Sequence, residues 1–321
     1  NGRIRKIQLA DDDSLAGGCD AAGDGLVSST VIGGNSCDSG CSIDGVDGAS
    51  AGLSYNIHMA LDANQNLYFT SGSNIYKVNT TIGVGIEKTT TISMVVGCPT
   101  GATCQSDIFS NPLALYLSSP SELAFDASGN LWITDRTNYR ILRFNPTSGQ
   151  IEKIAGTAAS CTSGDCGNDG NALTASLGEV TAMQVMSDGS VLIAENIAQS
   201  PFGSGASEPL YLSVIRRLLP NGSGGFTIQA EAGSNTDPVN GSIGDFENPS
   251  EAAFSEIQDI QEAQKDSGGN YIGDYEWLAT DQKLKLIRGV THTAPYQIQS
   301  VAGGVKWSDD CATDPVACSP T

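Results

Sequence analysis

Pro120-Ser-Glu-Leu-Ala-Phe-Asp126 opens the stretch that decides the fold, and Gly129-Asn-Leu-Trp-Ile-Thr-Asp135 and Asn138-Tyr-Arg-Ile-Leu-Arg-Phe144 follow it. In each run apolar and polar side chains alternate, as they do along a half-buried β-strand. Turn residues separate the runs, as in Asp-Ala-Ser-Gly-Asn at 126–130. The apolar run Lys153-Ile-Ala-Gly156 then closes the unit. The pattern predicts one small antiparallel sheet of four strands.

The same arrangement of strands recurs along the chain. Repeated units of four antiparallel strands are typical of the blades of a β-propeller. One blade cannot bury both faces of its sheet, so we expect the stacking of blades to bury Trp132, Phe125 and Leu192. The other sets of inner strands are Leu53–Asp62 with Asn66–Thr70 and Asn74–Val78, Thr181–Met186 with Asp188–Glu195 and Ser213–Leu218, and Ile257–Glu262 with Trp277–Asp281 and Lys283–Ile287. The apolar runs of the fourth strands end at Gly33, Gly97, Gly156, Gly233 and Gly303.

Several of these runs also resemble a known repeat family. Asn1-Gly-Arg-Ile-Arg-Lys-Ile7, Gly129–Asp135 with Asn138 and Arg140, and Lys153–Gly156 look like NHL repeats. Asp44-Gly-Val-Asp-Gly-Ala-Ser-Ala51 resembles the linker that precedes a new blade of such repeats. The resemblance implies an all-β, NHL-type β-propeller of four-stranded antiparallel blades. Six blades are expected in the full protein, and five are an alternative.

The register of the repeats bears on domain organisation. Residues 1–321 are expected to form a single propeller domain with about four and a half blades and boundaries near 34, 97, 156, 233 and 304. Asn1–Ile7 matches the third strand of a blade, and the tail from Val301 matches a linker that leads into another blade. We therefore expect the chain to be a section of a longer protein.

The first strand of each blade lines the central channel of a propeller, and its opening position is usually Gly in NHL repeats. The aligned residues are His58, Glu122, Ala182 and Asp259. An imidazole and two carboxylates around one axis suit a divalent cation, and oxygen-rich ligation favours Ca²⁺. The same groups are suited to acid–base catalysis. Solvated side chains at the channel mouth are the simpler interpretation.

The resemblance extends to propeller enzymes with channel metals. Amidating lyases depend on several channel histidines, but the chain has only His58 and His292, and His292 falls in the loop after a third strand. Lactonase-like calcium propellers use converging Glu, Asn and Asp residues, which Glu122 and Asp259 match in part. A metal-dependent hydrolase or lyase is therefore the alternative function, with His58, Glu122 and Asp259 as its metal ligands.

Charge and hydropathy exclude two classes of partner. Lys and Arg number 16 against 36 Asp and Glu, for a net charge of -20. Such a surface repels nucleic-acid phosphate and anionic lipid. No apolar stretch approaches the roughly 18 residues that a membrane span needs, so direct membrane insertion is not expected.

The cysteines indicate an oxidising compartment. Eight of the nine fall into close pairs in Gly-, Ser- and Asp-rich segments, and none has the spacing of a zinc ribbon. Small disulfide loops are the better interpretation, with Cys19 left to pair outside the chain or to compete for Cys37. We predict an extracellular or cell-surface location, with the periplasm as an alternative. The predicted disulfides join Cys37 to Cys41, Cys98 to Cys104, Cys161 to Cys166 and Cys311 to Cys318.

Other charged residues fall at strand ends. Asp135, Glu195 and Asp281 end second strands, where an acidic side chain usually ties its own turn together. The arginines of the third strands are interpreted as surface or inter-blade salt-bridge partners of small energetic weight. These arginines are Arg140, Arg143, Arg216 and Arg217.

Two insertions between predicted strands indicate a binding function. Residues 201–209 interrupt the third repeat and residues 264–276 the fourth, and loops on a rigid scaffold commonly carry binding sites. We predict an extracellular binding or scaffolding module of a larger protein rather than an enzyme. Its expected partner is a protein or glycan at a cell surface, or further copies of itself in an assembly.

Overall fold

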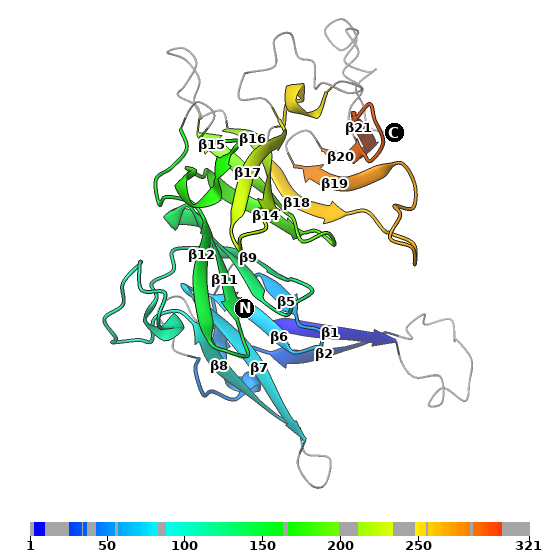
Figure 1. Cartoon of the computed structure of the whole chain (residues 1–321). Coiled ribbons are helices and arrows are strands. Elements are labelled where there is room, and N and C mark those ends of the chain that lie inside the picture. Colours follow the sequence, from blue (N-terminus) through cyan, green and yellow to red (C-terminus); the bar gives the residue numbers. More distant parts are fainter. Residues whose placement is uncertain are drawn as a thin grey trace, which may run out of the picture. The chain divides into compact units, whose positions relative to one another are not determined.

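The computed structural model describes residues 3–9, 26–33, 35–36, 43–54, 57–82, 88–162, 166–198, 211–233, 248–254, 256–282 and 285–303. In these residues the regular elements are β-strands and 3₁₀-helices of one turn. The chain divides into two compact units, Asn1–Pro120 and Ser121–Thr321, which we describe separately (Figure 1).

Unit 1 holds one four-stranded sheet and a hairpin. The hairpin pairs β1 (Ile4–Leu9) with β2 (Leu26–Ile32), antiparallel, as third and fourth strands of a blade do. The sheet has the order β5-β6-β7-β8. Its strands are β5 (Met59–Leu61), β6 (Leu67–Ser71), β7 (Asn74–Ile82) and β8 (Lys88–Val96), and a short parallel pair joins β3 (Asn35–Ser36) to β4 (Gly52–Leu53).

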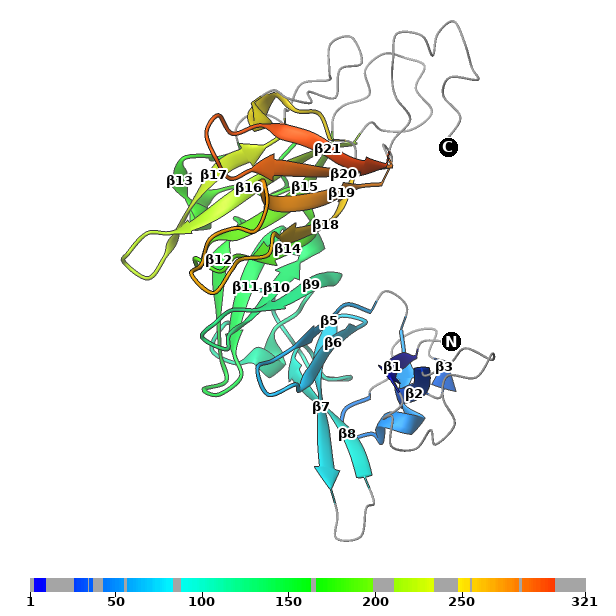
Figure 2. The ribbon, with the colours of Figure 1, turned by 90° about the vertical axis from the view of Figure 1, so that its right-hand side faces the viewer.

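Unit 2 holds three sheets, each with its blade strands in sequence order (Figure 2). A fifth strand, β13 (Gly170–Asn171), adds to the middle sheet beside β17. The first sheet is β9 (Pro120–Phe125), β10 (Leu131–Asp135), β11 (Arg140–Asn145) and β12 (Gln150–Ala155), the second is β14 (Glu179–Val185), β15 (Val191–Ala198), β16 (Tyr211–Pro220) and β17 (Phe226–Ala232), and the third is β18 (Ile257–Glu262), β19 (Tyr275–Asp281), β20 (Leu286–Thr291) and β21 (Ile298–Gly303).

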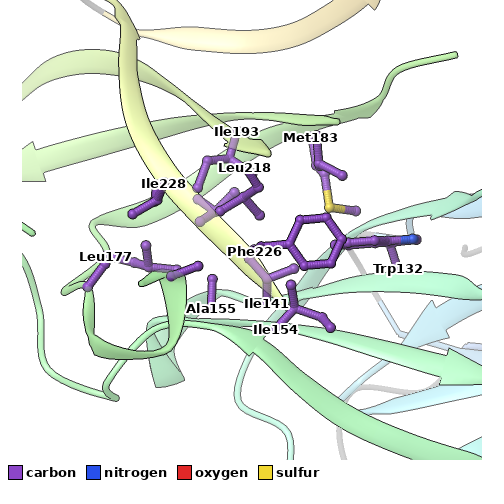
Figure 3. Close-up of a cluster of buried hydrophobic side chains, with 14 residues drawn as sticks. Trp132, Ile141, Ile154, Ala155, Leu177, Met183, Ile193, Leu218, Phe226 and Ile228 are labelled. Atoms are coloured by element: carbon purple, nitrogen blue, oxygen red, sulfur yellow. The ribbon is translucent and has the colours of Figure 1, made fainter. Parts of the chain in front are cut away.

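Successive blades of unit 2 share their apolar faces. Trp132 of β10 meets Phe226 of β17 edge to face, with ring centroids 5.3 Å apart, amid apolar side chains from both sheets (Figure 3). A second cluster joins the next two sheets, where Leu192 packs with Trp277. The predicted burial of Trp132 and Leu192 is confirmed. Phe125 is only partly buried.

A repeated acidic turn joins the first and second strands. The Asp126 carboxylate accepts hydrogen bonds from the backbone N–H of Ser128 (3.0 Å) and Asn130 (2.9 Å) and from Trp132 Nε1 (3.0 Å). Asn130 Nδ2 donates back to the same carboxylate at 2.9 Å. The Asp126 carboxylate is the acceptor for these backbone N–H groups, so the turn is specified by the side chains of its own residues. The same side-chain-to-backbone contacts form at Asp62 with Asn66 and at Asp266 with Asn270.

We expect Asp126→Ala to lower the free energy of unfolding by about 1–2 kcal/mol, as the loss of a capping carboxylate does. Desolvation raises the pKa of Asp126, but hydrogen bonds from Asn130, Trp132 and Ser128 outweigh it and hold the pKa below 3.8. The stabilisation is therefore present above that pH and is lost as the pH falls through the folded-state pKa. Urea unfolding at several pH values measures it. Glu152→Ala, which removes an exposed carboxylate that pairs with Arg143 at the surface, is the control, and an equal loss there would contradict the assignment.

Glycines close the blades because the backbone turns sharply after each fourth strand. Gly156 has a φ of +97°. A Cβ at this position would overlap the carbonyl oxygen of Tyr139 and lie 2.8 Å from the Cα of Arg140. Both the backbone conformation and the space therefore require glycine.

Gly156→Ala should destabilise the protein by about 1–3 kcal/mol more than Gly222→Ala, the usual cost of forcing extra atoms into packed structure. Gly222 is the matched control because its φ is also positive, at +73°, but a Cβ there meets nothing within 4 Å. Chemical denaturation of the two variants gives the difference. Equal midpoints would contradict the role of the close contact.

Candidate functional site

The predicted channel positions hold equivalent places in their blades. The backbone N–H of His58 donates to Thr70 Oγ1 at 2.9 Å, and that of Glu122 donates to Thr134 Oγ1 at 2.7 Å. In both cases the acceptor is the next-to-last residue of the second strand. Strand pairing gives the same register in the other two blades, where Ala182 faces Ala194 and Asp259 faces Thr280.

The first strands of unit 2 lie side by side. Ser121 Oγ of β9 approaches the carbonyl oxygen of Val180 in β14 (3.5 Å), and Thr181 Oγ1 of β14 donates to the carbonyl of Ile257 in β18 (2.7 Å). Figure 2 shows β9, β14 and β18 in this succession. In the middle strand the equivalent residue is Ala182, which is buried in the core between the second and third sheets.

Glu122 acts electrostatically on Asp259. Partial desolvation raises the pKa of Asp259, and the negative charge of Glu122 raises it further, against a hydrogen bond from the backbone N–H of Ile260. A neighbouring carboxylate of like charge disfavours the ionised form of Asp259. The structure thus brings two of the predicted site residues into electrostatic reach. His58 belongs to unit 1.

A calcium ion takes about six to eight oxygen ligands. Within the described ranges, no three His, Cys, Asp or Glu side chains gather closely enough to hold a metal ion. Glu122 and Asp259 would supply only part of such a ligand set. The predicted metal site with His58, Glu122 and Asp259 therefore stays a prediction.

Asp135 ends β10 as predicted, but the prediction that Glu195 ends its strand is wrong, because β15 continues to Ala198. Both carboxylates form buried ion pairs. Asp135 is fully buried and pairs with Arg140 (Nη2 to Oδ2, 2.7 Å), and Glu195 is fully buried and pairs with Arg216 (Nη2 to Oε1, 2.9 Å). Glu195 also accepts the backbone N–H of Gly178 at 2.8 Å. These acids are structural ion-pair partners inside their blades.

The interpretation of the arginines as weak surface partners is therefore wrong for Arg140 and Arg216. Both side chains are almost fully buried. Arg216 also donates to the carbonyl of Ser176 at 2.8 Å, which fixes the linker before the blade. Arg143 pairs with the exposed Glu152 as predicted. Arg217 joins two blades through Glu231 and Glu276, also as predicted.

Two of the predicted disulfides are confirmed. Cys98–Cys104 follows β8, with a Cα–Cα distance of 5.9 Å, and Cys161–Cys166 follows β12, at 5.7 Å. Disulfides of this kind persist in oxidising compartments outside the cytoplasm. No helix within the described segments is long and apolar enough to span a membrane.

The other two predicted disulfides are not confirmed. The first would join Cys37 to Cys41, and the second would join Cys311 to Cys318. Both Cys37 and Cys41 lie outside the described residues, as do Cys311 and Cys318 and the remaining cysteine, Cys19. The structure therefore supports two of the four predicted pairs, and the pairing of Cys41 and of Cys318 stays a prediction.

The predicted insertion of the fourth blade is present between β18 and β19. We call residues 263–274 the recognition loop. Lys265 Nζ binds Glu262 Oε1 (2.9 Å) and Ser187 Oγ (2.7 Å) and lies 4.2 Å from the centroid of the Tyr271 ring. The loop is thereby tied to its own blade and to the neighbouring one. The other predicted insertion, 201–209, lies outside the described residues.

The recognition loop presents apolar surface from this anchored base. Ile272 is 57 % exposed. The His292 ring lies against Tyr271, with centroids 5.4 Å apart, and the His292 backbone N–H donates to the Asp274 carbonyl at 3.1 Å. The turn after β20 therefore supports the loop from the other side.

Comparison with known proteins gives no family. No protein-family model matches the chain, and no curated protein matches it in sequence. The chain is similar in structure to an auxiliary nutrient binding protein from Bacteroides thetaiotaomicron (9% identity, 80% of this chain and 50% of that chain, TM-score 0.47). It is also similar to virginiamycin B lyase from Staphylococcus aureus (14%, 77% and 58%, 0.37) and to a gluconolactonase from Xanthomonas campestris (12%, 79% and 78%, 0.35).

The chain spans 50–60% of the length of the first structures that it matches. Likeness at such identities concerns the fold alone. The described sheets themselves are four-stranded and antiparallel, in sequence order. The chain is an all-β protein whose sheets are like the blades of a β-propeller.

Proposed function

We propose that the chain is a binding module of an exported protein, which recognises a protein or glycan outside the cytoplasm through the recognition loop. The observation that carries the proposal is the anchoring of an exposed insertion on a rigid blade, by Lys265 to Glu262 and Ser187. An ordered loop loses little conformational entropy on binding, which favours affinity. The disulfides support the location outside the cytoplasm.

Site-specific cross-linking tests this proposal. A photo-reactive residue at Ile272, in the full protein on intact cells, should give one defined adduct. The matched control is Leu173, which is 41 % exposed in the same unit but lies away from the loop. Protease or glycosidase treatment of the adduct then identifies its class. Adducts in equal yield at both positions, or at neither, would contradict recognition by the loop.

Lys265→Ala should reduce the cross-linking yield at Ile272 several-fold, because it removes the contacts to Glu262 and Ser187 that order the loop. The free energy of unfolding should change by less than about 1 kcal/mol, as is usual for an ion pair near the surface. Urea unfolding and cross-linking of the same sample separate the two effects. An unchanged yield would show that the anchor is not needed.

A metal-dependent propeller hydrolase or lyase is the second candidate. The electrostatic effect of Glu122 on Asp259, at equivalent first-strand positions of unit 2, favours it. The hypothesis adds His58 from unit 1 and takes Ca²⁺ as the ion. Hydrolysis of a panel of lactones and esters with added calcium tests it. Turnover that Glu122→Gln and Asp259→Asn each abolish would support it, and turnover that both variants retain would exclude this site.

A further inference from the structure

A polar groove of about 330 Å³ lies between the second and third sheets of unit 2. It is formed by β16 and β17 of one blade, by β19 and the turn after β20 of the next, and by the segment that links them. It is separate from the first-strand positions and from the recognition loop. Its polar lining consists of Arg217, Gln229, Glu231, Asn248, Glu276 and Tyr296.

Arg217 fixes the floor of this groove. Its Nε donates to Glu231 Oε2 (2.9 Å), and its Nη2 donates to Glu231 Oε1 (2.7 Å) and Glu276 Oε1 (2.8 Å). Trp277 Nε1 donates to Glu231 as well, at 3.1 Å. Desolvation lowers the pKa of Arg217, but the hydrogen bonds and charges of the two carboxylates raise it more, so the guanidinium stays charged. The two carboxylates are thus held in place and largely neutralised.

Several polar groups at the rim of the groove can still form hydrogen bonds with a ligand. Within the described part of the chain, neither the Gln229 amide nor Glu276 Oε2 has a hydrogen-bond partner. Asn248 Oδ1 accepts from the backbone N–H of Ser250 at 3.1 Å, which leaves its amide N–H groups as donors. Tyr296 is 58 % exposed and offers both a hydroxyl and a ring face. Donors, acceptors and an aromatic surface therefore line one cavity.

This combination matches a neutral sugar better than other small ligands. Each sugar hydroxyl is both donor and acceptor, so a planar amide or carboxylate can bind two adjacent hydroxyls at once. The apolar C–H face of the ring packs on an aromatic side chain. Two carboxylates against one guanidinium repel an anionic ligand, and Arg217 occupies the place that a cation would take. The volume lies at the lower end of the about 300–1,000 Å³ common for ligand pockets.

We propose that this groove binds a neutral sugar unit. The inference rests on the proposed binding function and names the ligand class that the module takes. It assigns Gln229, Asn248 and Glu276 to the hydroxyl groups and Tyr296 to the ring face. A free sugar and the end of a glycan chain share this chemistry, and the test distinguishes them.

Titration calorimetry of the full protein provides the test, with neutral hexoses and N-acetylhexosamines, their oligosaccharides, a uronic-acid oligosaccharide and a lysine-rich peptide. We expect binding of a neutral sugar that Gln229→Ala and Tyr296→Ala each weaken at least tenfold. The matched controls, Gln261→Ala and Tyr116→Ala, replace exposed residues that are not part of the groove lining, and they should bind normally. A preference for oligosaccharides over the monosaccharide would identify a glycan chain as the source.

Binding of only the acidic sugar or only the peptide would overturn the proposal, as would affinities that the groove variants leave unchanged. Circular dichroism confirms that each variant is folded. If no sugar binds but cross-linking at Ile272 succeeds, the groove assignment fails and the binding module stands. If a sugar binds in the groove but cross-linking at Ile272 fails, the groove assignment stands and recognition by the loop is contradicted.

Discussion

Glu195→Ala is expected to lower the free energy of unfolding by about 3–5 kcal/mol, because it leaves a buried guanidinium without its counter-charge. The Arg216 side chain is almost fully buried, and Glu195 also holds the backbone N–H of Gly178. Glu152→Ala is the matched control. That carboxylate pairs with Arg143 at the surface and is 56 % exposed, so its loss should cost less than about 1 kcal/mol. Urea unfolding measures both, and equal losses would contradict the structural role of the buried pair.

The double variant Glu195→Leu/Arg216→Met should recover part of this loss. Replacing both members of a buried ion pair by apolar residues of similar volume leaves no unpaired charge and is often close to neutral. Recovery will be incomplete, because Arg216 also donates to the Ser176 carbonyl. A double variant less stable than Glu195→Ala would show that the arginine acts mainly through those backbone contacts.

Trp132→Ala should cost about 3–5 kcal/mol of unfolding free energy in its own right, since it opens a cavity between two blades. The side chain is 1% exposed and packs against Phe226 and Met183. Its Nε1 also donates to Asp126, so the change weakens the acidic turn as well. Leu173→Ala, at an exposed site of the same unit, should change stability by less than about 0.5 kcal/mol. A small effect of Trp132→Ala would contradict the inter-blade core.

The blades could be predicted from the sequence because their signals are local. Short apolar runs between turn residues locate β10 and β15, whose side chains are buried along most of each strand. The turn at 126–130 is specified by Asp126 and Asn130 themselves. Gly156 marks the end of a blade because its positive φ excludes other residues. The same local reasoning found the pair Cys98–Cys104, whose members are six residues apart.

Interactions between distant segments could not be predicted in the same way. Arg216 looks like a surface residue in the sequence, and only the fold places it in the interior, where it pairs with Glu195. The groove joins Arg217 to Glu276, 59 residues later and in another blade, so no spacing could have indicated it. Alignment of the repeats placed Glu122 and Asp259 at equivalent positions, but the electrostatic effect of Glu122 on Asp259 follows from the order of β9, β14 and β18.

Recognition rather than metal-dependent catalysis is the central claim, and the metal content of the purified full protein tests it most directly. Elemental analysis after dialysis against a small amount of chelator should find no stoichiometric calcium or zinc. One equivalent of metal per chain, lost in Glu122→Ala and retained in Glu152→Ala, would contradict the claim and establish the first-strand carboxylates as a metal site.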